Sequence, residues 1–339
     1  MIYTLTPNPA LDISGNVDQI IQDEKNYVHE ELRCPGGNGI NAARIIKRLR
    51  APVIASGFLG GGIGKEVETL IQNEKVQTRF IKIAGHTRVS VTVANKATHR
   101  QTRLSFPGPE IRQNEIKALF QFVEKIKAPS LLVIGGSLPP GFSTATLKKL
   151  LQIARQKKLP TIVDVPAKIL KSILPHSSLL MIKPNLTELQ DLLNNKNITT
   201  LPEVVQAVQP LLTQVPLICV SSVEKGAALI TPFGTWFGKG PKIKSKGSVG
   251  AGDSMVGAIT AHLWKNGLVT ERGILLAANE AREIPNLLRW GLAAALATVS
   301  TPGTELGAAK KITELYPQIQ IQKLSEGQNR QLNLFVAGN

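Results

Sequence analysis

The chain is poor in the residues that bind metals through sulfur or nitrogen. Its 339 residues include two cysteines and five histidines. Cys34 and Cys219 are not spaced as a metal-binding or redox pair, and two cysteines do not make a disulfide framework. The histidines show no ligand spacing, so we assign them no chemistry. These shortages argue against a cysteine-held metal site or a disulfide-rich secreted domain, and they favour a reduced, cytoplasmic location with two free thiols.

Long apolar runs are also absent. No segment approaches 18 uninterrupted apolar residues, and the chain starts directly with the strand-like residues 2–5 instead of a charged and then apolar leader. We therefore expect a soluble, unsecreted protein without a membrane partner. With 42% apolar residues the chain can bury a large core, as one big domain or as one domain with a small appendage.

Acidic residues are few relative to basic ones. The chain has 24 Asp and Glu residues and 40 Lys and Arg residues, which gives a net charge of +16. Such a charge is typical of nucleic-acid-binding proteins. However, the basic residues are scattered in pairs, and the densest group, from Lys239 to Lys246, has no interleaved aromatics for base stacking. We expect an enzyme of anionic substrates, or a generally basic proteome, and no nucleic-acid partner.

The sequence does contain an alternation of short apolar runs and helical patterns. This alternation predicts an α/β fold with a mostly parallel sheet covered by helices on both faces. In such sheets, sites form beyond the carboxyl ends of the strands. The expected strands are 53–55, 131–134, 161–164, 179–182 and 217–220, and the expected helices include 39–49, 111–127 and 144–158.

Residues 87–106 break that rhythm. In 87–94 valines alternate strictly with polar residues, and after a turn a second alternating run covers 102–106. The pattern predicts a half-exposed antiparallel hairpin, which with residues 12–31 would make a small sheet standing off the main body. Arg88 and Arg103 fall on its polar face and could converge on one anion, although an arginine on an exposed strand is usually only solvated.

The most informative segment is 247–257. Gly250 and Gly252 end a polar stretch, and the apolar residues of 255–263 predict a buried helix directly after them. A glycine-rich loop leading into a helix leaves backbone N–H groups unpaired at the positive end of the helix dipole. The amides of Gly250, Ala251 and Gly252 therefore predict an anion hole suited to a phosphoryl group.

Asp253 is unusual in this loop because its carboxylate repels the phosphate that the loop attracts. One interpretation is a residue that caps the following helix. The other is a catalytic base that takes the proton from the hydroxyl group attacking the γ-phosphate of a bound triphosphate. The loop alone leaves the two evenly balanced.

Residues 247–259, GSVGAGDSMVGAI, resemble the second signature of the PfkB (ribokinase-type) carbohydrate kinases. Other motifs agree with this family in order and spacing across almost the whole chain, namely 4–12, 35–44, 135–139, 183–189 and 303–304. Five ordered motifs are a strong signal, where any one alone would be weak. The resemblance implies a ribokinase-like three-layer α/β/α fold with a small β-sheet lid, and it favours Asp253 as the base.

The resemblance also implies a sugar-binding site between the lid and the loop before 39–49. Asp12 would accept hydrogen bonds from sugar hydroxyls, and Arg88, Arg103 and Lys25 would hold the substrate's phosphate. Plainer alternatives are a turn at Asp12 and solvated arginines on the hairpin. The other implied sugar contacts are Gly36, Gly37, Asn41 and Ser137.

On the nucleotide side the resemblance implies that Lys183 reaches phosphate and that Asn185 and Glu188 hold water around Mg²⁺. Asn185 and Glu188 also fit an ordinary helix-capping pattern, which is the alternative. The other implied ATP contacts are Ser221, Gly226, Ser248, Gly250 and Gly252.

The implied activity is that of an ATP- and Mg²⁺-dependent phosphosugar kinase, with K⁺ left open as a further cofactor. We expect phosphorylation of fructose 6-phosphate at its 1-hydroxyl, with 1-phosphofructokinase and tagatose-6-phosphate kinase as alternatives. Arg88, Arg103 and Lys25 match the 6-phosphofructokinase type. Asn38 matches none of the three types, and Tyr27 replaces an arginine of the first. A catalytically inactive sugar-phosphate sensor is a more distant alternative.

These assignments divide the chain into two parts. The kinase core would comprise residues 1–11, 32–86 and 108–339, and the lid over the sugar would comprise 12–31 and 87–107. In the family that the chain resembles, the lid is commonly shared with a second subunit. We therefore expect a homodimer formed through the lid.

Overall fold

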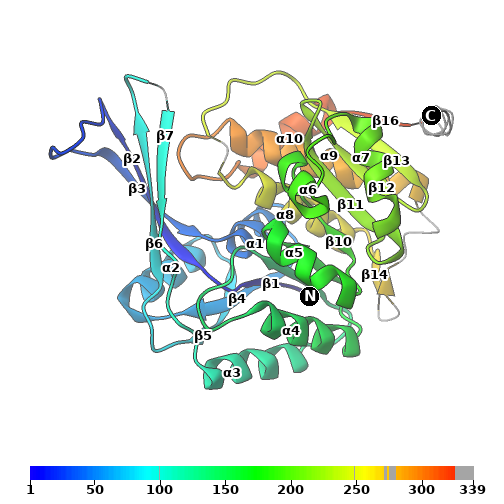
Figure 1. The fold of residues 1–339 in the computed structure, drawn as a ribbon, viewed down its shortest axis with the longest axis horizontal. Helices are drawn as coiled ribbons and strands as arrows, with labels where there is room; N and C mark the ends of the chain where they lie inside the picture. The colour runs from blue at the N-terminus through cyan, green and yellow to red at the C-terminus, as the bar shows by residue number, and fades with distance from the viewer. Residues whose placement is uncertain (99, 248, 271–272, 275–279, 325–339) are drawn as a thin grey trace.

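The computed structural model describes residues 1–98, 100–247, 249–270, 273–274 and 280–324 (Figure 1). A large sheet runs through the body, and a second, small sheet stands off to one side of it (Figure 1). A short hairpin of β14 (Val269–Thr270) and β15 (Gly273–Ile274) is separate from both. Within the described ranges, no helix is both long enough and apolar enough to cross a membrane.

The large sheet is mostly parallel, as the sequence predicts. Its strands are β1 (Ile2–Thr6), β4 (Val53–Leu59), β5 (Gln77–Lys82), β8 (Leu131–Gly135), β9 (Thr161–Asp164), β10 (Met181–Ile182), β11 (Leu217–Val223), β12 (Gly226–Thr231), β13 (Gly234–Lys239) and β16 (Gln320–Lys323). They lie in the order β16-β13-β12-β11-β10-β9-β8-β1-β4-β5. The seven strands β11, β10, β9, β8, β1, β4 and β5 pair in parallel. Strands β12, β13 and β16 extend the β11 edge in antiparallel pairs.

Helices cover both faces of this sheet. Because strand side chains alternate, Val133 joins the apolar cluster on one face and Leu132 joins the cluster on the other. The first cluster is closed by α1 (Asn38–Arg48), α2 (Gly61–Asn73), α8 (Ala251–Lys265), α9 (Glu280–Val299) and α10 (Ala309–Leu315). The second is closed by α3 (Gln113–Glu124), α4 (Thr144–Gln156), α5 (Ala167–Ile173), α6 (Leu186–Leu193) and α7 (Leu201–Val208). The three-layer α/β/α architecture is therefore confirmed.

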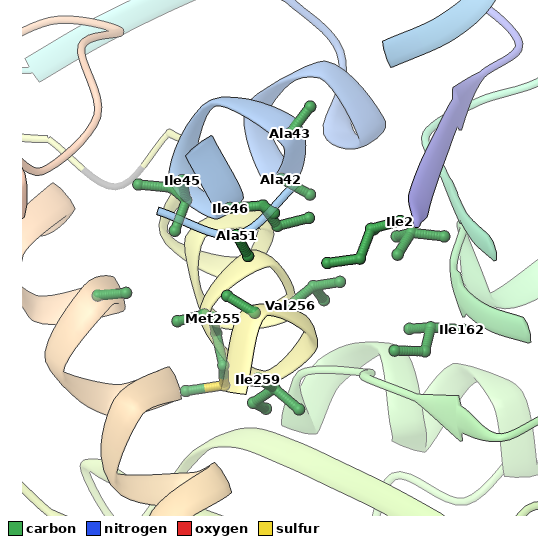
Figure 2. Packing of buried hydrophobic residues seen from close by; sticks show 14 of the residues in the cluster. Ile2, Ala42, Ala43, Ile45, Ile46, Ala51, Ile162, Met255, Val256 and Ile259 are labelled. Atoms are coloured by element: carbon green, nitrogen blue, oxygen red, sulfur yellow. The ribbon is translucent and has the colours of Figure 1, made fainter. Parts of the chain in front are cut away.

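Helices α1 and α8 pack directly against each other. Figure 2 shows Ile45 and Ile46 of α1 beside Met255, Val256 and Ile259 of α8, in one cluster with side chains from the sheet. Glycine allows the close approach, since a Cβ on Gly257 of α8 would come within 2.7 Å of the Ala42 carbonyl oxygen. This contact fixes the first turn of α1 relative to the first turn of α8.

The small sheet contains β2 (Ala10–Val17), β3 (His29–Gly36), β6 (Arg88–Asn95) and β7 (Arg100–Ser105) in the order β3-β2-β6-β7. The predicted hairpin is thus confirmed, and β6 pairs in parallel with β2. Its polar face is the inner one, because Ser90 and Thr92 are buried. The apolar face is turned outward, where Leu104 of β7 pairs with Val91 and is 57% exposed.

Candidate active site

A cavity of about 660 Å³ lies where the central parallel strands end. Its wall contains Asp164 at the end of β9, Lys183 directly after β10, and the first turn of α8. The volume suits a small-molecule site, and the carboxyl edge of a parallel sheet is the expected position. The other lining residues are Asn38, Asn185, Glu188, Ser221, Ser222, Lys225, Gly226, Met255, Leu292, Ala295, Leu296 and Val299.

The first turn of α8 faces this cavity with Ala251, Gly252 and Asp253. Gly250 precedes the helix with φ of 77°, in the left-handed region where a residue with a Cβ is strained. No side chain of the described residues caps α8, so its first N–H groups are left for an anion. Ser248, an expected ATP contact in the same loop, lies outside the described residues.

Asp253 is buried beside α1 and does not cap its own helix. Its Oδ2 accepts a 2.8 Å hydrogen bond from Nδ2 of Asn41. The pKa of Asp253 is raised to about 6, first by burial and then by the charge of Asp164, while the Asn41 bond and Lys183 act in the opposite direction. The carboxyl is therefore ionised at neutral pH with a pKa near the working range of a general base. This environment favours the base over the capping interpretation.

Lys183 and Asp164 form an ion pair in the same cavity, with 3.5 Å between Nζ and Oδ1. Burial alone would lower the pKa of Lys183, but the carboxylates of Asp164, Glu188 and Asp253 outweigh burial, and the pKa is raised. Lys183 thus keeps its charge and can bind phosphate. The cavity wall carries three carboxylates and, with Lys225, two ammonium groups. A bound polyphosphate would therefore need an additional cation.

Asn185 and Glu188 form a complete capping box at the start of α6. The Asn185 side chain accepts a bond from the Glu188 N–H at 2.9 Å, and Oε2 of Glu188 accepts one from the Asn185 N–H at 2.8 Å. The capping alternative is thus observed, yet both residues also line the cavity. The described residues contain no cluster of three or more His, Cys, Asp or Glu side chains that would hold a metal alone.

One end of the cavity is formed by the last residues of β11 and the turn that leads to β12. Ser221 bonds to the Pro184 carbonyl through its N–H, and Gly226 begins β12. Between them, Ser222 and Lys225 have φ of 63° and 62°, and both line the cavity. Such backbone is uncommon for residues with a Cβ, and it often occurs at ligand-binding turns.

Asp12 lies on the inner face of the small sheet and is 6% exposed. A Cβ at Gly36 would come within 2.3 Å of its carboxylate, so only glycine allows this approach. Burial raises the pKa of Asp12, while Arg103, then Arg88 and Arg44, act in the opposite direction. Arg88 and Arg103 lie on the same face of the small sheet as Asp12, and neither forms an ion pair with it among the described residues.

The turn before α1 brings Asn41 to Asp253. Gly37 has φ of 120°, and a Cβ there would lie 2.5 Å from Cγ2 of Thr6. Asn41 then follows within the first turn of α1, where its Oδ1 accepts a 3.3 Å bond from Arg44 and its Nδ2 donates to Asp253. Its expected bond to a sugar hydroxyl would use the second N–H of the amide or the remaining lone pair of Oδ1.

Arg88 and Ser137 meet through Asn8. The Arg88 guanidinium donates to the carbonyl oxygens of Asn8 and Phe106, and Nδ2 of Asn8 donates to Oγ of Ser137 at 3.1 Å. The buried Oδ1 of Asn8 has no partner within the described part of the chain. Asn8 therefore offers a free acceptor between two expected sugar contacts, although its motif did not single it out as a site residue.

Lys25 is not brought to this group within one chain. Strand β2 runs from Ala10, which pairs with Arg88, to Val17 at its far end. That is a length of roughly 23 Å at about 3.3 Å per residue. Lys25 follows beyond that end, in the exposed connection to β3, where its Nζ lies 5.1 Å from the centre of the Tyr27 ring.

Asp164 is a site residue that sequence reasoning missed. It pairs with Lys183, accepts a 3.3 Å bond from Nδ2 of Asn38, and raises the pKa of Asp253. The signal was available, because Asp164 ends an expected apolar strand at the edge where sites form. A single aspartate at a strand end is, however, as common in turns as in sites.

Comparisons with known proteins agree with this geometry. The model of the pfkB family of carbohydrate kinases matches residues 8–311. Tagatose-6-phosphate kinase of Staphylococcus epidermidis is 34% identical over 266 residues, which cover 78% of this chain and 85% of the relative. 1-Phosphofructokinase of Bacillus subtilis is 28% identical, covering 96% and 100%, and ATP-dependent 6-phosphofructokinase isozyme 2 of Escherichia coli is 31% identical, covering 93% and 97%.

Solved structures give the same result. Phosphofructokinase-2 from Escherichia coli in complex with substrates and products has a TM-score of 0.84 and 31% identity, covering 93% of this chain and 98% of its own. The complex of that enzyme with potassium has a TM-score of 0.82 and 30% identity, with the same coverage. The match extends over the body and the small sheet together.

Proposed function

The chain belongs to the pfkB family of carbohydrate kinases, and from this premise we propose that it phosphorylates fructose 6-phosphate at the 1-hydroxyl with ATP. The observation that carries the choice of substrate is the register of the small sheet, which places Arg88 and Arg103 on the same inner face as Asp12. Two guanidinium groups on the inner face of the lid suit the phosphate already on the sugar, and the carboxylate suits its hydroxyls.

In this proposal Asp253 is the catalytic base. Its ionised carboxylate takes the proton of the 1-hydroxyl as the oxygen attacks the γ-phosphorus and the bond to ADP breaks. The amides of Gly250, Ala251 and Gly252 stabilise the charge on the transferred phosphoryl group. Support comes from the free first turn of α8 and from the buried position of Asp253.

Lys183, Ser221 and Gly226 are the proposed ATP contacts at the other end of the cavity. The proposed metal is Mg²⁺, which prefers oxygen ligands. The residues present fit such an ion, because the cavity has more carboxylates than ammonium groups and because capping engages only one carboxylate oxygen of Glu188. Glu188 and Asn185 would hold it through water, and the ion would neutralise phosphate charge. K⁺ stays a second candidate cation.

The lid of residues 12–31 and 87–107 is proposed to cover the sugar and to form a homodimer, with 1–11, 32–86 and 108–339 as the kinase core. Seven large hydrophobic side chains are exposed among the described residues, and six of them lie in the lid, namely Ile20, Ile21, Tyr27, Val28, Leu104 and Phe106. Exposed large apolar side chains concentrated in one part of a protein are typical of an interface. Lys25 would then serve the site of the partner subunit.

The alternatives are 1-phosphofructokinase and tagatose-6-phosphate kinase activity. A direct assay of ADP release with fructose 6-phosphate, fructose 1-phosphate and tagatose 6-phosphate separates the three. We expect the highest kcat/KM with fructose 6-phosphate. A tenfold or greater preference for either other sugar would replace our choice. The same assay without Mg²⁺, or with Na⁺ in place of K⁺, tests the two cations.

Arg103→Ala tests the phosphate contact itself. Loss of a charge-assisted bond to phosphate weakens binding about 10- to 150-fold, so KM for fructose 6-phosphate should rise by that factor. The change in kcat should be smaller, because a phosphate remote from the reacting hydroxyl is held alike in the ground and transition states. Arg100→Ala is the matched control, since Arg100 is an exposed arginine on the same strand but on the outer face.

A further inference from the structure

Arg44 is a buried arginine at the centre of α1 that the proposed chemistry does not use. It is 3% exposed, and its Nε donates a 2.6 Å bond to Oε1 of Glu74. Its Nη1 donates to the Pro35 carbonyl and to Oδ1 of Asn41. Asn41 lies three residues earlier on the same helix, so the two side chains are neighbours on one face. The guanidinium is therefore fixed on one side by Glu74 and held against the amide on the other.

The side-chain amide of Asn41 has an oxygen that accepts hydrogen bonds and an NH₂ group that donates them. Its two neighbours, Arg44 and Asp253, require different groups of the two. A guanidinium only donates hydrogen bonds, so Arg44 requires the oxygen of the amide. An ionised carboxylate only accepts them, so Asp253 requires the NH₂ group, and that bond is 2.8 Å long. Rotating the amide by 180° would place oxygen against carboxylate and NH₂ against guanidinium. Both contacts would be repulsive.

We propose that Arg44 is a positioning residue for phosphoryl transfer, which fixes the Asn41 amide so that its NH₂ group always faces Asp253. The inference rests on the proposed role of Asp253 as the base. Asp253 can impose this orientation only while it is ionised, because a protonated carboxyl would donate to the oxygen of a rotated amide equally well. Arg44 keeps its charge at every working pH, so it holds the orientation in both protonation states.

The charges around Asp253 show why this orientation matters. Asp164 from β9 and Asp12 from β2 raise the pKa of Asp253, as burial does, whereas Lys183 and the Asn41 bond oppose them. A hydrogen bond to the ionised form favours that form. If the amide rotated freely, Asn41 would stabilise the ionised form of Asp253 less, and the pKa of Asp253 would rise further.

The test is the pH dependence of kcat in the Arg44→Met variant. We expect kcat at neutral pH to fall roughly tenfold, as expected for loss of a hydrogen bond to a charged group. The acid limb of the profile should move upward by about half a pH unit or more, while KM for ATP changes little. Arg44→Lys keeps a charged donor and should restore most of the limb's position. If Arg44 only stabilised the fold, the acid limb would stay in place in Arg44→Met, and Arg44→Lys would have no shift to restore.

Arg48→Met is the matched control. Arg48 lies on the next turn of α1 and donates a 2.8 Å bond to the other oxygen of Glu74, but it has no bond to Asn41. Its loss should lower the melting temperature about as much as Arg44→Met does and leave the acid limb in place. If Arg44→Met folds poorly, the double variant with Glu74→Gln removes the charge of the carboxylate whose Oε1 has lost its donor, and it gives the same test.

Two results would overturn the inference, and they differ from failure of the proposed function. A wild-type acid limb in Arg44→Met, with stability lowered as in Arg48→Met, would leave Arg44 a purely structural residue. An equal shift of the limb in Arg48→Met would have the same consequence. Near-normal turnover of Asp253→Asn would instead remove the base itself, and with it the premise.

Discussion

At the scale of single residues, Asp253 combines a functional demand with a cost in stability. Its carboxylate is buried, and its pKa is raised to about 6, mainly by burial. In the unfolded chain the pKa of an aspartate is about 3.9. Between these values the folded state binds more protons than the unfolded state, so the free energy of unfolding falls as the pH rises from about 4 to about 6. Above about pH 6 the buried charge of Asp253 has its full destabilising effect, and the free energy of unfolding falls no further on its account.

Replacing Asp253 by Asn should therefore stabilise the protein and inactivate it together. Loss of the base should lower kcat by roughly 10²- to 10⁴-fold. Removal of the buried charge should raise the free energy of unfolding by on the order of 2 kcal/mol at pH 7.5, and by little near pH 4. Urea unfolding at both pH values, beside turnover at pH 7.5, measures this. A variant equally stabilised at both pH values would show that the buried charge is not the cause.

The residues of the site differ in how far the sequence could predict them. Asp12 and Gly36 could be predicted as site residues because each stands in a short motif, and Gly36 lies against the Asp12 carboxylate. Arg88 and Arg103 could be placed on one face because the hairpin alternates strictly, and that face also contains Asp12. The ties of Asn41 to Arg44 and Asp253 were not predicted. The bond from Asn41 to Asp253 depends on the packing of α1 against α8, which joins residues more than 200 positions apart. No local pattern encodes such a contact.

At the scale of elements, the entry into α8 determines where the amides proposed to bind phosphate point. The left-handed conformation of Gly250 turns the chain so that Ala251 already begins the helix. The sequence predicted a helix from 255 onward, since apolar periodicity starts only there. The first turn contains glycine and aspartate, which favour turns, and burial against α1 makes it helical all the same.

Gly250→Ala tests this entry, and Gly267→Ala at the other end of α8 is its control. Gly267 has φ of 65°, and a Cβ added there would have no atom within 4 Å, so alanine should cost only the left-handed strain of about 1 kcal/mol. At Gly250 the Cβ would also meet Leu306 Cδ2 at 2.6 Å. We expect an additional loss of stability and a fall in kcat of roughly tenfold or more, measured by thermal unfolding and turnover. Equal effects at the two glycines would exclude a special role for this turn.

Among the strands, most of the parallel ones were predicted, whereas β5 and the antiparallel edge were not. The runs at 131–134 and 161–164 are short, apolar and bounded by turn residues, and they correspond to β8 and β9. Residues 226–231 of β12 are a continuous buried run, which periodicity does not separate from a helix segment. Their strand character comes from pairing with β11 and β13.

At the scale of the whole molecule, the outer part of the small sheet has its apolar face turned away from the body. Val91 and Leu104 are paired there, whereas Ile13, the other neighbour of Val91, packs against the apolar cluster of the body. The inner face contains the polar residues of the site, so the usual pattern of polar outside and apolar inside is reversed. A second copy of the chain covering that outer face would restore the pattern.

Leu104→Glu should therefore separate the proposed dimer. A charge in the centre of an apolar interface should raise the dissociation constant roughly 100-fold or more, and activity should fall at low protein concentration. Phe233→Glu is the control, because Phe233 is the one exposed large hydrophobic of the described residues outside the lid. Sedimentation equilibrium gives the mass of each variant. An unchanged mass for Leu104→Glu would show that this face is not the interface.

The distance between Lys25 and the arginines of its own chain has a consequence for kinetics. If Lys25 serves the partner's site, a lone chain lacks a substrate ligand, and turnover per molecule is no longer a constant. Far below the dissociation constant, the amount of complete site grows with the square of the protein concentration. The reaction would then be second order in enzyme, so that halving the protein concentration in a dilute assay would lower the rate about fourfold. In a cell, each increase in expression would raise the flux more than proportionately.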